Sequence, residues 1–561
     1  MSATPTPTAA AGGMFDIDEV DVGGVRLRTF TNAPPSLRAI WDASAVHGDA
    51  TYLVYEDERW TYSRAHAMVA ALARQLSEVH GVSKGDRVAV AMRNYPEWVL
   101  SFWAVASLGA VAVPLNAWWT GPELAYGLTD SGARVLLADG ERLERVGPLL
   151  AGTAVETVIG ARAGDLPPGA LAFADVIAAG GGESDPTLPA VDIAPDDDAT
   201  IMYTSGTTGR PKGAVGTGRN IGGHVMNAIY AAIHRAVPGG PSAAGPPITL
   251  LTFPLFHVGG LHSFLIPYTV SGGAVVLLYR WDTAKALDLI EREQVTAVAG
   301  VPTTMFELLD EARKQGRELS SLSGVASGAT LVPPELVRRI DTQFAHRAAP
   351  TNGYGLTETS GAAVANAGAD YVAKPDSVGT PISPVMEIRI ADADGQPVPT
   401  GETGEIWLKG PTIFKGYFNN PGATADAITD GWFHTGDAGR LDEDGFLYVV
   451  DRLKDVIIRG GENIYAAEIE AVLYEHPDVA EAAIVGMPDE RYGEQVAAFV
   501  RLRDGSTADA DAIRTHVAAQ LAAFKVPTVV RIVSEALPVN ASGKVLKRQL
   551  RDALLADEPV A

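Results

Sequence analysis

The segment TSGTTGRPKG, residues 204–213, concentrates groups that bind anions. It holds four Ser or Thr hydroxyls, three glycines and two cations within ten positions. Glycines let backbone N–H groups converge on an anion, and the hydroxyls and Lys212 add further donors. The apolar run of DDATIMY, residues 197–203, directly precedes it and predicts a strand. We therefore expect a strand-to-loop turn that cradles phosphate groups.

The spacing of this segment separates it from another kind of phosphate loop. A Walker loop needs four residues between its first glycine and the Gly-Lys-Ser/Thr triplet. Here Gly206 is followed by Gly209, and Lys212 then precedes a glycine. The spacing disfavours a P-loop NTPase, and a surface turn with incidental hydroxyls is the alternative reading.

Composition places the chain among ordinary globular proteins. It has 561 residues, 47% hydrophobic and 20% charged, which favours several domains with a substantial core. The formal net charge is -24 and no long run of Lys and Arg occurs, which argues against nucleic-acid binding. Cysteine is absent, so a disulfide framework, a thiolate nucleophile and a thiolate metal site are excluded.

Residues 1–13 have neither a basic region nor an apolar region of the signal-peptide kind, so we expect a flexible tail and a cytoplasmic protein. Two uncharged stretches, residues 98–115 and 250–278, are long enough to suggest membrane spans. Glycines and prolines interrupt both, which favours buried helix-then-strand units without a transmembrane span. Peripheral membrane contact stays open as the alternative.

Helical patterns such as residues 62–80 alternate with short apolar runs such as residues 87–92 and 274–278. This alternation predicts an α/β fold with largely parallel sheets covered on both faces. From Gly379 the strands shorten and turn residues separate them, which predicts a β-rich subdomain. We place an N-terminal domain at residues 14–453 and a small α+β C-terminal domain at residues 454–561.

Five ordered motifs resemble the adenylate-forming superfamily, which comprises acyl-CoA synthetases, adenylation domains and luciferases. They are YTSGTTGRPKG (203–213), NGYGLTETS (352–360), GEIWLKGPTIFKGYFNNP (404–421), the long segment 430–470 that begins DGWFHTGD, and LPVNASGKVLKRQL (537–550). The resemblance implies an active site between a large N-terminal domain and a small, mobile C-terminal domain that acts as a lid.

The resemblance also implies residue roles in binding ATP and Mg²⁺. A carboxylate that attacks the α-phosphate of ATP needs positive charge and fixed donors around it. Glu358 resembles the family's Mg²⁺ ligand, Thr204 is expected to contact both the metal and the phosphates, and Thr357 is expected at the α-phosphate. Asp437 resembles the acceptor for the ribose hydroxyls, assisted by Arg452. The remaining nucleotide-binding residues implied are Ser205, Gly206, Thr207, Thr208, Gly209, Lys212, Gly328, Ala329, Thr330, Asn352, Gly353 and Tyr354.

Lys544 resembles the family's catalytic lysine, a single cation that reaches the charge developing between the carboxylate and the α-phosphate. The resemblance implies a second half-reaction in which a thiol replaces AMP after the small domain moves. Lys454 matches the hinge position of the family, and Gly460 and Gly461 are expected to face the pantetheine chain of CoA.

The identity of the acid is the part of the predicted reaction that the sequence determines least. His257 matches the residue beside the acyl pocket of CoA ligases, and the expected lining, which is mostly small, includes Val258, Gly259, Gly260 and Val301. Small lining residues leave volume for a fatty chain or a bulky ring. The predicted function is an ATP-, Mg²⁺- and CoA-dependent carboxylate–CoA ligase with a medium- or long-chain fatty acid preferred. An aryl or cinnamate-type acid, and an acyl-AMP ligase without CoA transfer, are the alternatives, and a homodimer is left open.

Overall fold

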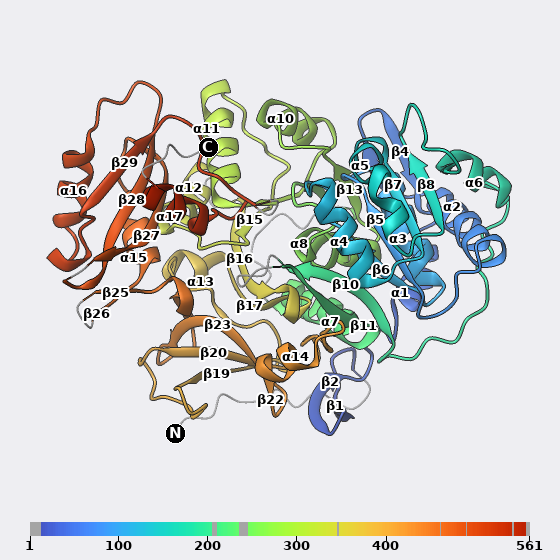
Figure 1. Cartoon of the computed structure of the whole chain (residues 1–561), viewed down its shortest axis with the longest axis horizontal. Helices are drawn as coiled ribbons and strands as arrows, with labels where there is room; N and C mark the ends of the chain where they lie inside the picture. The colour runs from blue at the N-terminus through green and yellow to red at the C-terminus, as the bar shows by residue number, and fades with distance from the viewer. Residues whose placement is uncertain are drawn as a thin grey trace.

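The computed structural model describes residues 13–204, 210–234, 245–344, 347–459, 462–489, 491–540 and 543–556, apart from the side chains of Lys454 and Asn463. Residues 1–12, most of the expected tail, lie outside it. Two large sheets with their helices form most of the N-terminal part, and a third sheet and a C-terminal sheet stand beside them (Figure 1). This arrangement confirms the predicted α/β class.

The first large sheet has eight strands and carries the phosphate segment near one edge. Its core strands are parallel, and β11 joins antiparallel to β10. In spatial order the strands are β21 (Gly416–Tyr417), β11 (Lys212–Thr217), β10 (Asp198–Thr204), β6 (Val111–Pro114), β5 (Arg87–Ala91), β7 (Val135–Asp139), β8 (Thr157–Ala161) and β9 (Leu171–Ala172).

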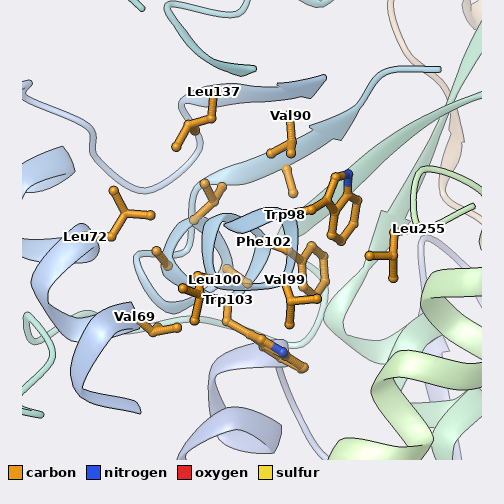
Figure 2. Close-up of a cluster of buried hydrophobic side chains, with 14 of the residues drawn as sticks. Val69, Leu72, Val90, Trp98, Val99, Leu100, Phe102, Trp103, Leu137 and Leu255 are labelled. Carbon is orange, nitrogen blue, oxygen red and sulfur yellow. The ribbon is translucent and has the colours of Figure 1, made fainter. Parts of the chain in front are cut away.

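Helix α3 (Pro96–Ser107) is the centre of the main hydrophobic core. Proline at its first position suits a helix start, and eleven of its twelve residues are buried, so it packs on every side. Figure 2 shows its Trp98, Phe102 and Trp103 among side chains of α2 (Tyr62–Arg74), β5 and β7. The apolar stretch 98–115 is thus a buried helix followed by strand β6, as expected.

The second large sheet has nine strands and supplies most of the expected nucleotide-binding and acid-binding positions. Strands β3, β13, β12, β14, β15 and β16 run parallel, and β17 returns antiparallel. The strands are β18 (Thr380–Pro381), β17 (Gly361–Ala367), β16 (Ala349–Leu356), β15 (Gly324–Gly328), β14 (Ala297–Gly300), β12 (Ile248–Leu251), β13 (Ala274–Leu277), β3 (Thr51–Tyr55) and β4 (Glu58–Thr61). The helices α10 (Thr283–Arg292), α11 (Pro302–Gln315) and α12 (Pro334–Gln343) pack against this sheet in a second core.

The third sheet is antiparallel, as the turn-rich sequence after Gly379 predicts. It contains β19 (Glu387–Ala391), β20 (Gly404–Lys409), β23 (Trp432–Leu441), β22 (Ile428–Thr429) and β24 (Leu447–Arg452). No helix in the described part of the chain is long and apolar enough to span a membrane.

The C-terminal sheet is built from β25 (Ile457–Arg459), β26 (Glu462–Ile464), β27 (Val479–Asp489), β28 (Gly493–Leu502) and β29 (Val529–Val533). Its helices are α15 (Ala466–Tyr474), α16 (Ala510–Ala518) and α17 (Lys547–Ala556). It lies beside α11 and α12 (Figure 1), where Arg503 Nη1 is 3.4 Å from Asp310 Oδ2 of α11. The C-terminal part therefore contacts α11, one of the helices that pack against the second large sheet.

Candidate active site

The expected site residues gather where three adjacent parallel strands end. Val301 follows β14, Ala329 follows β15 and Thr357 follows β16. Ligands of open α/β sheets bind at the carboxyl ends of the strands, so the fold places these residues in a typical binding position. Gly353 and Gly355 of β16 are exposed although they lie in this central strand.

Asp437 is a buried carboxylate with donors on both of its oxygens. It lies on β23 directly opposite Arg452 of β24, and the Arg452 Nε is 3.1 Å from Asp437 Oδ1. The Tyr354 hydroxyl donates to Asp437 Oδ2 at 2.7 Å. Burial, and then the charge of Asp437, raise the pKa of Tyr354, so this hydroxyl keeps its proton and stays a donor. The structure thus brings together three of the residues predicted to bind nucleotide.

Glu358 is the second buried carboxylate, in the short helix η5 (Thr357–Thr359). The Tyr417 hydroxyl of β21 donates to its Oε1 at 2.7 Å. Burial raises the pKa of Glu358, and the hydrogen bond from Tyr417 opposes that rise. The Lys212 ammonium lies 5.0 Å from the centroid of the Tyr417 ring. Tyr417 therefore contacts both a predicted phosphate-binding lysine and the predicted metal ligand.

Sequence reasoning did not single out Tyr417. The only available signal is its place in KGYF, inside one of the motifs that carry the resemblance. Its role depends on the pairing of β21 with β11, in which Tyr417 lies opposite Ala214, about two hundred positions earlier in the chain. No local pattern in the sequence contains that information.

The two ends of the phosphate segment are described, and its centre is not. Thr204 ends β10 opposite Lys212 at the start of β11, and the Thr204 hydroxyl donates to the Lys212 carbonyl at 3.4 Å. The pairing holds both ends of the turn on the same edge as Tyr417. The predicted residues between them, Ser205, Gly206, Thr207, Thr208 and Gly209, lie outside the described residues.

The wall expected to hold adenine is formed by adjacent strands β15 and β16. Gly328 pairs with Gly353, and Asn352 pairs with Ser327, whose buried hydroxyl has no hydrogen-bond partner among the described residues. Ala329 has a positive φ of 65° and is exposed, as is Thr330 after it. The backbone therefore turns sharply at the end of β15 and leaves a flat surface of small residues.

Lys544 lies on a tight turn that reaches into this site. Its N–H donates to Asn540 Oδ1 at 2.9 Å, and its carbonyl accepts from the Asn540 N–H at 2.8 Å. Gly543 has φ +82°, and a Cβ there would lie 2.8 Å from Cγ1 of Val301. Glycine is thus required by both the backbone and the contact. The loop carrying Lys544 is seated on a residue of the predicted acid pocket.

A cavity of about 120 Å³ lies at this contact, lined by Gly543, Val301, Phe253, Trp118 and Arg93 among others. Phe253 also stacks on Phe264 with ring centroids 6.2 Å apart. The junction between the Lys544 loop and the N-terminal part is therefore largely aromatic and apolar on its inner side.

His257 starts the short helix α8 (Val258–Gly260), and its Nδ1 accepts the Gly259 N–H at 3.1 Å. Burial lowers the pKa of His257 to about 4, so the ring is neutral and carries its proton on Nε2. A Cβ on Gly260 would lie 2.2 Å from the Pro254 carbonyl, so Gly260 packs against backbone. Val258 belongs to the main core. Of these four predicted pocket residues, His257 and Gly259 are the ones that are not fully buried.

The predicted hinge and CoA contacts are only partly described. Lys454 lies in the short helix η6 (Leu453–Asp455), between the third sheet and the C-terminal sheet, and its side chain is not described. Gly460 and Gly461 lie outside the described residues, between β25 and β26. These three roles remain predictions.

Comparison with known proteins identifies the family of this chain. The family model for AMP-binding enzymes matches residues 40–418, and the model for the AMP-binding enzyme C-terminal domain matches residues 468–544. A solved o-succinylbenzoate CoA synthetase (MenE) from Bacillus subtilis, in complex with the acyl-adenylate intermediate OSB-AMP, superposes with a TM-score of 0.76 at 32% identity, covering 92% of this chain and 98% of that one. The chain therefore belongs to the AMP-binding enzyme family, within the adenylate-forming superfamily.

Two curated relatives narrow the class of reaction. A feruloyl-CoA synthase from an Amycolatopsis species is 39% identical over 492 residues, 88% of this chain and 93% of the relative. The long-chain-fatty-acid–CoA ligase FadD13 of Mycobacterium tuberculosis is 34% identical over 510 residues, 90% of this chain and 95% of the relative. The chain is an AMP-forming acid–thiol ligase that uses ATP and CoA. The predicted preference for a fatty acid is not confirmed.

We expect Tyr417→Phe to weaken the use of Mg²⁺ with ATP. The variant removes the hydrogen bond that holds the buried Glu358 carboxylate, and such a bond to a charged group contributes about 1.5–3 kcal/mol. The Mg²⁺ concentration for half-maximal pyrophosphate exchange should rise about tenfold or more. Tyr448→Phe is the matched control, because the Tyr448 hydroxyl donates to Asp442 at 3.1 Å, outside the site. An equal response of both variants would contradict the assignment.

We expect Gly543→Ala to slow adenylation, because the added Cβ would push the Lys544 loop away from Val301. A shift of about 1 Å in a catalytic group can cost up to about 100-fold in rate. Gly505→Ala is the control: Gly505 has φ +84°, and a Cβ added there would meet no atom within 4 Å, so it shares the backbone strain without the contact. Both variants are assayed by acid-dependent pyrophosphate exchange. Equal losses of activity in the two variants would show that the contact between Gly543 and Val301 has no role in adenylation.

Proposed function

We propose that this acid–CoA ligase activates an aromatic carboxylic acid of the arylpropenoate type. The more similar of the two curated relatives is a feruloyl-CoA synthase, and the solved relative holds an acyl adenylate of succinylbenzoate. Phe253 lines the cavity beside the Lys544 loop, together with Trp118, and aromatic side chains favour packing against an aromatic ring. A fatty acid is the second candidate, favoured by the similarity to FadD13.

In the first half-reaction, a carboxylate oxygen of the acid attacks the α-phosphorus of ATP, and the bond to pyrophosphate breaks. Thr357, which follows β16, contacts the α-phosphate in this proposal, and Lys212 with the loop 204–209 holds the outer phosphates. Asp437 and Arg452 bind the ribose hydroxyls, since a carboxylate has lone pairs beyond those that Arg452 and Tyr354 use. Lys544 neutralises the charge that develops between the two reactants.

Mg²⁺ fits the donors of this site. Glu358 is an oxygen donor whose burial disfavours its charged form, and a divalent cation beside it would favour that form. Mg²⁺ typically takes one or two carboxylates from the protein and completes its shell with phosphate oxygens and water. Glu358, with Thr204 of the phosphate segment, would hold the ion, which would neutralise charge on the phosphates when bound.

In the second half-reaction, the sulfur of CoA attacks the acyl carbonyl and the bond to AMP breaks. The Lys544 loop fills the space at Val301 in this structure, so the C-terminal part has to move before a thiol can enter there. We place the moving unit at residues 454–561 on a fixed unit of residues 14–453, with Lys454 as the hinge. Gly460 and Gly461 would then line the path of the pantetheine chain.

The acid class is tested with a panel of matched acids, ATP, Mg²⁺ and CoA, scored by AMP release and by mass detection of the thioester. We expect cinnamates to have kcat/KM values at least about tenfold above those of C8 to C16 fatty acids, because a rigid ring fits a stacked aromatic wall with less loss of conformational freedom. The reverse order would establish the fatty-acid alternative. Acid-dependent AMP release without thioester would show an acyl-AMP ligase instead.

We expect Lys544→Ala to abolish acid-dependent pyrophosphate exchange while much of the thioester formation from preformed acyl adenylate survives. Removal of one such charged donor from a transition state costs about 100- to 1,000-fold. Lys525→Ala is the control, since Lys525 pairs with Glu468 within the C-terminal part at 2.6 Å. Full exchange activity in the Lys544 variant would overturn its catalytic role.

A further inference from the structure

Asp451 is a buried carboxylate at the boundary between the fixed unit and the moving unit proposed above. It precedes Arg452 on β24 and is 5% exposed. Its Oδ1 accepts the Arg452 N–H at 2.7 Å, and its Oδ2 accepts the N–H of Ala467, in the first turn of α15, at 3.4 Å. Asp451 thus belongs to the fixed unit by its place in the chain and contacts the moving unit through its side chain.

The first turn of α15 receives its carboxylate from the other unit. Tyr465, which precedes the helix, makes no side-chain hydrogen bond to that turn among the described residues. Helix α16 is capped from within the same unit, because Asp509 accepts the N–H groups of Asp511 and Ala512 at 3.1 and 2.9 Å. Free N–H groups and partial positive charge at the start of a helix favour a carboxylate there. Asp451 supplies that carboxylate to α15 across the boundary.

Lys547 is a second positive group of the moving unit that acts on Asp451. It begins α17, and its ammonium pairs with Glu470 of α15 at 2.7 Å. Burial would lower its pKa, but the charges of Glu470, Asp451 and Asp455 raise that pKa above the usual value. Lys547 therefore stays charged and attracts the Asp451 carboxylate.

Lys547 is also joined closely to the loop that carries Lys544. Lys544 lies three positions earlier in the chain, on the turn that its hydrogen bonds with Asn540 close. The Leu546 N–H donates to the Pro538 carbonyl at 2.8 Å, so the two legs of the loop are held together up to the residue before Lys547. A displacement of Lys547 would therefore displace the Lys544 loop.

Asp451 and Arg452 connect the two sides of this boundary. Neighbouring side chains of a strand point to opposite faces. Arg452 meets Asp437 at 3.1 Å in the candidate nucleotide site, whereas Asp451 meets α15. With Lys454 as the proposed hinge, Asp451 stays in the fixed unit while α15 and Lys547 move. The movement that admits the thiol would therefore separate Asp451 from both of them.

We infer that Asp451 and Lys547 are positioning residues that hold the Lys544 loop in place during adenylation and release it for the second half-reaction. The inference rests on the proposed role of Lys544 and on the proposed hinge. Asp451 attracts α15 and Lys547 to the end of the strand that supplies Arg452 to the ribose site. The catalytic lysine is thereby placed relative to the bound nucleotide. Both residues act through Lys544 and not on a reactant.

The first test uses Asp451→Asn, which keeps the shape of the side chain and removes its charge. We expect kcat for acid-dependent pyrophosphate exchange to fall about tenfold or more, because a shift of about 1 Å in a catalytic group can cost up to about 100-fold. The KM for ATP should change by less than about twofold, as expected for an interaction that matters only in the transition state. Thioester formation from preformed acyl adenylate should be retained.

Three outcomes of this test would overturn the inference. They are unchanged exchange, equal losses in both half-reactions, and a raised KM for ATP with unchanged kcat, which would place the effect on Arg452. Unchanged exchange in Asp451→Asn beside an inactive Lys544→Ala would leave the proposed role of Lys544 standing. Exchange that survives Lys544→Ala would overturn the proposed role itself.

The second test measures whether the two residues act through one contact. The rate of exchange is divided by the rate of thioester formation in the same preparation, so a smaller folded fraction cancels. Lys547→Met should lower this ratio about tenfold, as Asp451→Asn does, and Lys547→Arg should restore part of it because the cation is kept. The double variant of Asp451→Asn and Lys547→Met should lose no more than the larger single loss, since coupled residues are not additive.

Glu468→Gln is the matched control, because it breaks an ion pair of the same helix α15 that lies within the moving unit. Glu468 pairs with Lys525 at 2.6 Å, and its loss should leave the ratio of the two half-reactions unchanged. Losses that multiply in the double variant, or a ratio that falls equally in Glu468→Gln, would contradict the assignment.

Discussion

Two buried carboxylates lie at the candidate site, and both have to stay ionised if they bind the nucleotide and its Mg²⁺ as we propose. Glu358 and Asp437 are 8% and 4% exposed, and burial without donors would favour protonation of a carboxyl group. Each carboxylate is therefore met by a tyrosine hydroxyl at 2.7 Å, from Tyr417 and Tyr354 respectively. A phenol is a neutral donor that fixes a carboxylate without cancelling its charge.

This constraint links parts of the fold that are far apart in the sequence. Tyr417 belongs to the edge of the first large sheet, Tyr354 belongs to the second, and Glu358 lies in η5 between two strands of the second. Asp437 and Arg452 belong to the third sheet. Each hydrogen bond from a tyrosine to a carboxylate thus joins two of these three parts of the fold. The geometry of the candidate nucleotide site therefore depends on how the three sheets pack against one another. A shift between sheets would leave a buried carboxylate without its donor, which is costly.

The same reasoning explains how much of the site could be predicted from the sequence. The resemblance named Asp437 and Arg452, and both lie on neighbouring strands of one hairpin, so one continuous motif contains the pair. The α/β class followed from alternating helical and apolar runs. Tyr417 could not be predicted because its role depends on pairing between distant strands. His262 Nε2, which is buried and has no hydrogen-bond partner among the described residues, could not be predicted either, because a missing partner is a property of the packed core.

Small residues can set substrate choice in the proposed acid site through its size. Gly355, Gly361 and Ala362 keep the wall between cleft and core thin, and added volume there would collide with backbone or with the His224 ring. A wall of this kind selects by size, and an extra methylene changes the binding free energy by only about 1–3 kcal/mol. Hydrogen-bonding groups in a dry environment discriminate more strongly, because the wrong substrate leaves them unpaired.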